Sequence, residues 1–410
     1  MKRCGAEAFM RLPFIFLVAL LNQAAGQVPA VELIRAPEAG LQPQACVDAV
    51  GTVHLIYGKS GNESGWAPGD LFYVRMKPGE KEFSKPIRVN SQPKCAVPVS
   101  TAGGGQLAVG KGGRVHIVWN GSRPPKPKGE GAAKPAGEGG EKQKKEGGDI
   151  KPLFYARLND DGTAFEPQRN LAGKTEALDG GGTIAADGSG NVFILWHARG
   201  ETPGEGFRRV YLAHSKDEGK TFEAESRVSS PLSGACSCCS MRALTDAEGR
   251  LFAAFRGAGT GVHRDSFLLV SPKPGSPFEE VKLDEWNVNY CPASSYGLGQ
   301  SAAGMLVAWE LKNQIYFAAF DPQSHKLSNS ILVGGEGVNR KYPVIVANAR
   351  GEKLVAWTEG VSWSKSGSVA WQIYGADDRL IGAKGEAPGV PPSSQATAFA
   401  RPDGSFAVII

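Results

Sequence analysis

One unit recurs along this chain of 410 residues: a turn glycine, then alternating apolar residues that end in an aromatic or aliphatic side chain. Alternation with a period of two is typical of a strand with one buried face, and the glycine suits the turn before it. The seven copies are Gly51…Tyr57, Gly113…Trp119, Gly190…Trp196, Gly249…Phe255, Gly304…Trp309, Gly351…Trp357 and Gly404…Ile410. Such a repeat predicts similar β-units packed side by side.

A second hairpin follows the first six copies. Its first strands are predicted at Leu71–Arg75, Leu153–Leu158, Val210–Ser215, Phe267–Ser271, Ile315–Phe320 and Val369–Tyr374. Four antiparallel strands per unit predict an all-β propeller, with seven blades expected and six as the alternative. The last hairpin, Ala396–Ile410, has no such partner, so we expect Val31–Arg35 to complete its blade and close the ring.

The first 26 residues are predicted to be an export signal. Lys2, Arg3 and Arg11 precede an apolar run from Leu12 to Leu21, and the small residues 24–26 follow it. This order is that of a secretory signal, and the run is too short to span a bilayer. We therefore expect a secreted or periplasmic protein with one propeller domain over residues 27–410 and no stable membrane insertion.

The segment Gly121–Lys151 interrupts the second repeat and is predicted to be disordered. It is rich in Gly, Lys, Glu and Pro and has no apolar periodicity. It is either a tolerated loop insertion or a basic tether to a polyanion. The net charge of +5 resides in this segment and in the first 26 residues. The folded part is thus not basic, no nucleic-acid partner is expected, and we expect a monomer.

The stretch from Ser215 to Phe222 predicts a turn that is held by its own side chains. The Ser and Asp oxygens can accept hydrogen bonds from the turn's N–H groups, and Gly219 can adopt a positive φ. The pattern S-x-D-x-G-x-T-F resembles the Asp-box of the sialidase-like (BNR-repeat) β-propellers. The resemblance assigns structural roles to Ser215, Asp217, Gly219 and Phe222.

The strand order predicts that a functional site lies on the opposite face from these turns, at the rim of the central channel. In the family, three Arg residues hold the carboxylate of sialic acid, a Tyr activated by a Glu is the nucleophile, and an Asp is the acid/base. The candidate catalytic residues here are Tyr342, Glu310 and Glu359. The candidate substrate-binding residues are Arg242, Arg256, Arg340, Arg199 and His197. No residue is assigned as the catalytic Asp.

A cysteine cluster is the most unusual feature of the sequence. Cys236, Cys238 and Cys239 precede one blade, and Cys291 precedes the next, so the four should meet at the rim. The spacing is similar to a C-x-C-C…C-P pattern in uncharacterised exported sialidase-like proteins. Disulfide staples suit an exported chain, while clustered thiolates suit Cu or Zn, and free redox-active thiols are a third reading. No other cofactor is expected.

These observations leave several functions open. The resemblance implies a protein that binds or hydrolyses extracellular glycans, including acidic sugars, and an enzyme of this kind would be an exo-sialidase-like glycoside hydrolase. The cysteine cluster instead suggests a metal-binding or redox propeller. A non-catalytic protein-interaction scaffold is the third alternative, because a fold does not determine a function.

Overall fold

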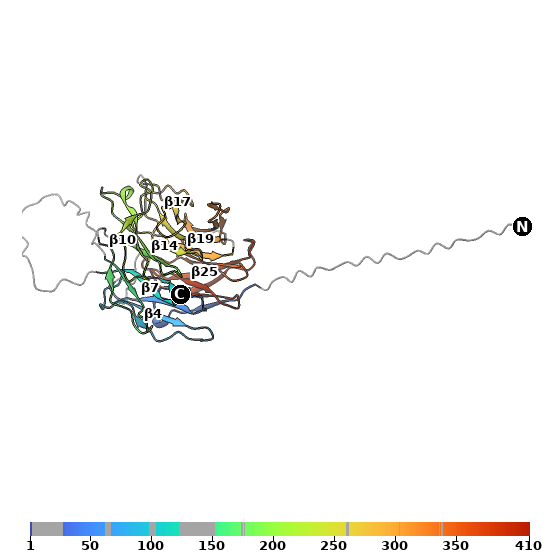
Figure 1. Ribbon diagram of the computed structural model, residues 1–410. Coiled ribbons are helices and arrows are strands. Elements are labelled where there is room, and N and C mark those ends of the chain that lie inside the picture. The colour runs from blue at the N-terminus through green and yellow to red at the C-terminus, as the bar shows by residue number, and fades with distance from the viewer. Residues whose placement is uncertain are drawn as a thin grey trace, which may run out of the picture.

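The chain folds into seven small β-sheets arranged as a ring, as the computed structural model shows (Figure 1). The structure describes residues 1, 28–61, 67–97, 104–122, 152–173, 175, 177–259, 262–302, 304–335, 337 and 339–410. The expected export signal and the interior of the 121–151 segment lie outside the described residues. The prediction of an all-β propeller with seven blades is confirmed.

Each of the first six blades begins with its innermost strand and continues outward. Blades one to three are β2 (Leu41–Val47), β3 (Val53–Lys59), β4 (Asp70–Met76) and β5 (Ile87–Arg88); β6 (Gln106–Val109), β7 (Val115–Asn120), β8 (Leu153–Arg157) and β9 (Arg169–Asn170); and β10 (Ala177–Ala186), β11 (Val192–Ala198), β12 (Arg209–Ser215) and β13 (Ser226–Arg227).

Blades four to six follow the same plan, except that two short strands share the outer edge of blade five. They are β14 (Arg242–Thr245), β15 (Leu251–Arg256), β16 (Ser266–Ser271) and β17 (Glu279–Lys282); β18 (Tyr296–Ser301), β19 (Gly304–Leu311), β20 (Gln314–Asp321), β21 (Lys326–Leu327) and β22 (Ile331–Leu332); and β23 (Arg340–Ala347), β24 (Lys353–Glu359), β25 (Gly367–Tyr374) and β26 (Gly385–Val390).

The helical content of the described residues is three short 3₁₀ turns, at Pro37–Ala39, Lys111–Gly113 and Glu205–Phe207. None of the helices in this part of the chain has the length and apolar character needed to cross a membrane.

The ring is closed by the two ends of the propeller. Blade seven consists of β27 (Thr397–Ala400), β28 (Phe406–Ile409) and β1 (Val31–Ile34). The prediction that the N-terminal strand completes this blade is confirmed, with a difference in direction. β1 runs parallel to β28, with Val31 opposite Phe406, so the last blade has three strands and is not fully antiparallel. A parallel strand fits because the chain reaches this edge from outside the blade and not through a hairpin.

The repeated glycines and aromatics explain the blades. All seven turn glycines have a positive φ, between 77° and 123°, which residues with a Cβ rarely adopt. The repeated aromatics Trp119, Trp196, Trp309 and Trp357 lie at the far ends of the second strands and are fully buried between neighbouring blades. Each unit thus buries its apolar face against the next one, which favours a closed ring over separate sheets.

The turn from Ser215 to Phe222 has the expected internal hydrogen bonds. Ser215 Oγ donates to Asp217 Oδ1 over 2.8 Å and accepts from the Gly219 N–H, also over 2.8 Å. The Thr221 N–H and hydroxyl donate to the Asp217 carboxylate over 2.9 and 2.6 Å. Gly219 has a φ of 75°, and the Phe222 ring packs edge-on against Tyr155. The turn therefore fixes the position where one blade contacts its neighbour.

The Asp217 carboxylate is expected to make stability sensitive to acid. Burial favours the neutral form, but hydrogen bonds from Thr221 and Ser215 outweigh it and lower the pKa to about 2. Since the folded pKa lies below the unfolded value of 3.8, the contribution is present above pH 4 and is lost as the pH falls toward 2. Asp217→Asn should lower the free energy of unfolding by about 1 kcal/mol at pH 7.

Urea unfolding of Asp217→Asn and wild type at pH 7 and at pH 2.5 measures this effect. The difference between the two proteins should be smaller at pH 2.5. A difference that is constant with pH would show that the charge of Asp217 does not stabilise the turn.

Candidate functional site on the loop face

The two faces of the propeller differ in what they carry. One face carries the glycine turns and the second-hairpin turns, since the Glu218 N–H donates to the Gly190 carbonyl over 2.9 Å. The other, here called the loop face, carries the connections from each blade to the next. Loops from several blades converge there, so it is where binding groups can be brought together.

A pocket of about 370 Å³ lies on the loop face at blades four to seven. This rim pocket is lined by Tyr290, Cys291, Pro292, Ala293, Asn313, Asn339, Lys341, Tyr342, Val361, Ser362, Trp363 and Ser393. Two of its aromatic side chains are open to solvent: Tyr290 is 53% exposed and Trp363 is 50% exposed. Exposed aromatic rings beside amides and hydroxyls are typical of a binding site, not of a core.

Left-handed backbone is concentrated in the rim pocket. Five of the lining residues that are not glycine have a positive φ, between 48° and 61°: Ala293, Asn313, Asn339, Tyr342 and Ser393. Such conformations cost free energy in residues with a Cβ, most of all in a bulky one such as Tyr342, and they gather at functional sites. The strand register also shifts between Lys341 and Val344 in β23, so the bulge there re-aims the Tyr342 side chain.

A second cavity, of about 350 Å³, is the central channel, to which every innermost strand contributes. It adjoins the rim pocket along the chain, since Tyr342 lines one cavity and Pro343 the other. Arg242, at the start of β14, lines the channel. Its hydrogen bonds to Gln106 Oε1 and to the Tyr296 carbonyl are long, at 3.4 and 3.5 Å. Burial lowers the pKa of Arg242 to about 10.

Among the described residues, Arg242 forms no ion pair with a carboxylate. A guanidinium that is partly desolvated without a counter-charge is costly, and an anionic group in the channel would offset that cost. Of the predicted substrate-binding residues, Arg242 is therefore the one placed to meet an anion.

Arg256, in contrast, lies inside the protein. Its side chain is fully buried, and its two terminal nitrogens donate to the carbonyls of Arg264 and Glu310 over 2.6 Å each. The guanidinium lies 5.1 Å from the centre of the Trp286 ring and 3.7 Å from the Glu310 carboxylate. These contacts join blades four and five, so Arg256 sits between blades and not on the rim.

Arg340 and Glu359 form a second ion pair, within blade six, in which Arg340 is fully buried and Glu359 is partly buried. Arg340 Nε donates to Glu359 Oε1 over 3.0 Å, and its other nitrogens donate to carbonyls in the 333–335 segment. Burial favours the neutral form of Glu359, but hydrogen bonds from Trp357 and Lys384 outweigh it, so its pKa is lowered. Neither residue lines the rim pocket.

Glu310 and Tyr342 lie near each other. Glu310 is fully buried, and its Oε1 accepts the Asn313 N–H over 2.7 Å. Burial raises the pKa of Tyr342, and the nearby Cys239 and Glu310 raise it further. A nucleophilic Tyr needs a lowered pKa or a base that takes its proton, and the raised pKa of Tyr342 does not meet the first of these conditions.

The remaining two predicted residues, Arg199 and His197, lie away from the rim pocket and the central channel. Arg199 is exposed after β11 and does not line either cavity. His197 is fully buried, and burial together with the Arg208 charge lowers its pKa to about 3. A neutral, buried His197 cannot supply a positive charge to a ligand.

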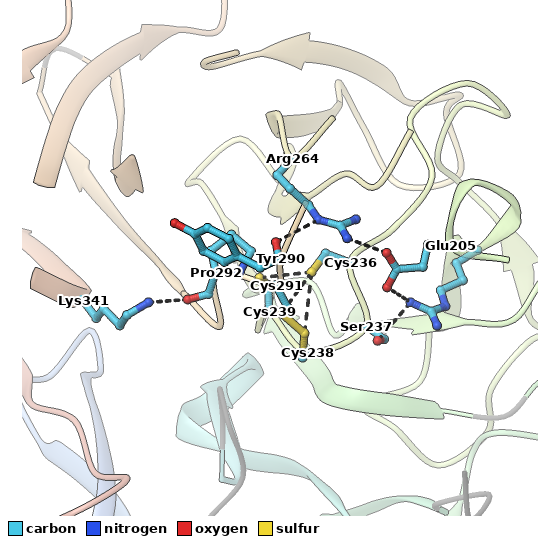
Figure 2. The surroundings of a disulfide bond; sticks show 11 residues. Glu205, Cys236, Ser237, Cys238, Cys239, Arg264, Tyr290, Cys291, Pro292 and Lys341 are labelled. Atoms are coloured by element: carbon cyan, nitrogen blue, oxygen red, sulfur yellow. Dashed lines mark hydrogen bonds and ion pairs between the residues drawn. A yellow bond between two sulfur atoms is a disulfide. The ribbon is translucent and has the colours of Figure 1, made fainter. Parts of the chain in front are cut away.

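The four cysteines come together as expected, at the edge of the rim pocket (Figure 2). Cys238 and Cys291 form a disulfide that joins the connections before blades four and five. Cys236 Sγ lies 3.5 Å from Cys291 Sγ, 3.8 Å from Cys238 Sγ and 3.4 Å from Cys239 Sγ. Cys236 and Cys239 are fully buried thiols. Three of the four cysteines, Cys236, Cys238 and Cys291, lie close enough together that they could hold a metal ion. Cys46 and Cys95 are free thiols elsewhere in the protein.

Trp363 and Tyr290 are not among the site residues predicted from the sequence. Both stand in polar loops without alternation, in Ser362-Trp363-Ser364 and Asn289-Tyr290-Cys291. An aromatic residue in such a loop does not fit the pattern of a buried strand. Its position outside any strand pattern is the sequence signal that could have indicated a binding role. Of the left-handed residues, Asn313 and Asn339 carry a weak signal, since Asn adopts a positive φ more readily than other residues with a Cβ.

Comparison with known proteins supports the architecture. No family model matches the chain, and no curated protein matches it. Similar solved structures include a protein of unknown function from Dyadobacter fermentans, with 16% identity over 82% of this chain and 94% of that one, and a TM-score of 0.52. An α-L-arabinanase from Penicillium chrysogenum, complexed with arabinobiose, has 11% identity over 86% of this chain and 99% of that one, and a TM-score of 0.52.

The Hadza microbial sialidase Hz136 has 13% identity over 78% of this chain and 63% of that one, with a TM-score of 0.48. The structural neighbours thus include sialidases and arabinanases. At these identities the similarity shows a shared propeller fold and no more.

Proposed function

We propose that this protein binds carbohydrate at the rim pocket, outside the cytoplasm, and does not hydrolyse it there. The observation that carries the proposal is the pocket itself: about 370 Å³ of space bordered by the exposed rings of Tyr290 and Trp363. The C–H faces of sugar rings can stack on such aromatics. The amides of Asn313 and Asn339 offer the paired donors and acceptors that sugar hydroxyls require.

The channel gives a reason to expect an acidic sugar. Arg242 lies in the cavity that adjoins the rim pocket, with long hydrogen bonds and no carboxylate partner among the described residues. A sugar carboxylate would give this guanidinium a partner that matches it in charge and planar geometry.

The lining of the rim pocket favours binding without hydrolysis. Most glycosidases use two carboxyl groups on either side of the scissile bond. The described residues that line this pocket include no Asp or Glu. Tyr342 is the remaining nucleophile candidate, and the raised pKa of its hydroxyl opposes that role.

Titration calorimetry with N-acetylneuraminic acid, glucuronic acid and glucose tests the proposal. Trp363→Ala should weaken binding of every sugar about tenfold or more, because each 1.4 kcal/mol of lost contact is a factor of ten. Arg242→Gln should weaken the two acidic sugars by a similar factor and leave glucose unchanged. Leu380→Ala is the matched control, since this half-exposed side chain lies in a turn outside both cavities.

Three results would overturn parts of the proposal. Equal affinities for Trp363→Ala and wild type would remove the rim pocket as the site. An equal loss of acidic and neutral sugars in Arg242→Gln would remove the carboxylate contact. Release of the fluorophore from an aryl sialoside, lost in Tyr342→Phe, would make the protein a hydrolase.

A further inference from the structure

The cysteine cluster has more sulfur atoms than a staple needs. A single disulfide between Cys238 and Cys291 already joins the two connections. Yet Cys236 and Cys239 are fully buried with their sulfur atoms 3.4 Å apart, and Cys236 Sγ is in contact with both sulfurs of the disulfide. A thiol against the disulfide, with a second thiol beside it, adds nothing to the crosslink, so this arrangement calls for another role.

The spacing of the sulfur atoms suits a metal ion. Four thiolates around an ion with bonds of about 2.3 Å form a tetrahedron whose edges are about 3.8 Å. The distances from Cys236 Sγ to the other three sulfurs are 3.4, 3.5 and 3.8 Å. Cys236, Cys238 and Cys291 also form the group of metal-ligating side chains that lies within 4.8 Å. Separation of the Cys238 and Cys291 sulfurs by one edge length would give three ligands around the ion. Cys239, which lies beside Cys236 but outside that group, would move toward the ion to supply the fourth.

Backbone hydrogen bonds hold both cysteine segments in place. The Cys236 N–H donates to the Arg256 carbonyl over 2.9 Å, and the Ser240 N–H donates to the Ser294 carbonyl over 3.0 Å. The Gly180 N–H donates to the Ser237 carbonyl over 2.5 Å. Ligands held this way lose little conformational freedom when an ion binds, as in a preorganised site.

Polar groups around the cluster suit a buried anionic centre. Arg256 acts electrostatically on Cys239, and Arg264 acts on Cys236, although Glu310 also faces Cys239. Within the described residues, Arg256 Nε, Arg264 Nη1 and Ser294 Oγ are buried without hydrogen-bond partners. Buried donors without partners are rare, and the positive charge of the two arginines beside the cluster would favour the thiolate form of its sulfur atoms.

We propose that Cys236, Cys238, Cys239 and Cys291 form a site for a thiophilic d¹⁰ cation, Zn(II) or Cu(I), which opens when the Cys238–Cys291 disulfide is reduced. A dithiol supplies the two electrons and two protons: the Sγ–Sγ bond breaks, two thiols form, and the dithiol becomes a cyclic disulfide. As the ion binds, the thiols release their protons to solvent and sulfur–metal bonds form. Ligands that are all sulfur select such soft or borderline ions.

The experiment compares the folded protein before and after treatment with dithiothreitol, which is then removed under anaerobic conditions. Native mass spectrometry measures the number of ions bound after addition of Zn(II) in one arm and Cu(I) in the other. Competition with a chromophoric chelator gives the affinity. Reduced wild type should bind one ion per chain, and the oxidised protein should bind none.

Cys236→Ser should weaken binding about 100-fold or more. Cys95→Ser is the matched control, since it removes a buried thiol outside the cluster and should change nothing. Circular dichroism checks that each variant is folded, and Cys239→Ser replaces Cys236→Ser should that variant not fold.

Two outcomes contradict the proposal. Equal binding by reduced wild type and Cys236→Ser, including none by either, would leave the cluster a disulfide beside two thiols. Equal binding by oxidised and reduced wild type would show that the disulfide does not control the site. The arm in which one ion per chain survives chelator competition identifies the metal.

Discussion

Deletion of residues 28–35 is expected to lower the free energy of unfolding by on the order of 5 kcal/mol. The deletion removes β1, which is hydrogen-bonded along β28 and packs Val31 and Ile34 against the core of the last blade. It also removes the Ala30 and Ile34 carbonyls, which accept from the N–H groups of Phe406 and Ile410 over 2.9 and 3.1 Å. A loss of this size is a large part of the stability of an ordinary domain.

Urea unfolding compares the deletion with Glu32→Ala, which keeps the strand and removes a solvent-exposed ion pair with Arg401. That control should change stability by less than about 1 kcal/mol. A synthetic peptide of residues 28–36, added in excess, should restore part of the loss. An unchanged urea midpoint for the deletion variant would mean that blade seven is stable with only its two strands β27 and β28.

Arg256→Ala is expected to cost about 3–5 kcal/mol, the range for breaking one partner out of a buried ion pair. The substitution leaves the Glu310 carboxylate buried without its counter-charge, and it removes the donors to the Arg264 and Glu310 carbonyls. It also removes the guanidinium that packs on Trp286.

A double-mutant cycle with Glu310→Gln tests this explanation. The neutral amide at position 310 should recover part of the loss in Arg256→Ala, so the two effects should not add. Arg379→Ala is the surface control, because its side chain is 86% exposed and should change stability by less than about 0.5 kcal/mol. If the changes in unfolding free energy of the two single variants simply add in the double variant, the ion pair with Glu310 is not how Arg256 stabilises the protein.

The sequence predicted the fold because the fold depends on local signals that repeat. Gly190 and Trp196 specify a turn and a buried ring in one blade, five further copies give the same pattern, and the last copy ends in Ile410. The parallel direction of β1 could not be predicted, since Val31–Arg35 has the same alternation whichever way it pairs. Strand pattern specifies the buried face and not the partner or its direction.

The site was predicted less well, because it depends on contacts between residues that are far apart in sequence. Arg256 and Arg340 look like ligand-binding arginines in sequence, but the folded protein supplies both with carbonyl and carboxylate partners, Arg256 partly from the next blade and Arg340 from its own blade and the connection before it. Arg242 has no carboxylate partner among the described residues because it lines the central channel, which is formed where the seven innermost strands meet. The meeting of the four cysteines was predictable, since both segments precede adjacent blades. The pairing of Cys238 with Cys291 was not.

The closure of the ring by β1 also has a consequence for the order of synthesis. β1 is made early, but its partner residues Phe406–Ile409 are made roughly 370 residues later. At synthesis rates of about 5–20 residues per second, β1 waits on the order of 20 seconds or more without a partner. The first six blades are complete in themselves and can form during that time. The propeller can therefore become a closed ring only after blade seven has been made.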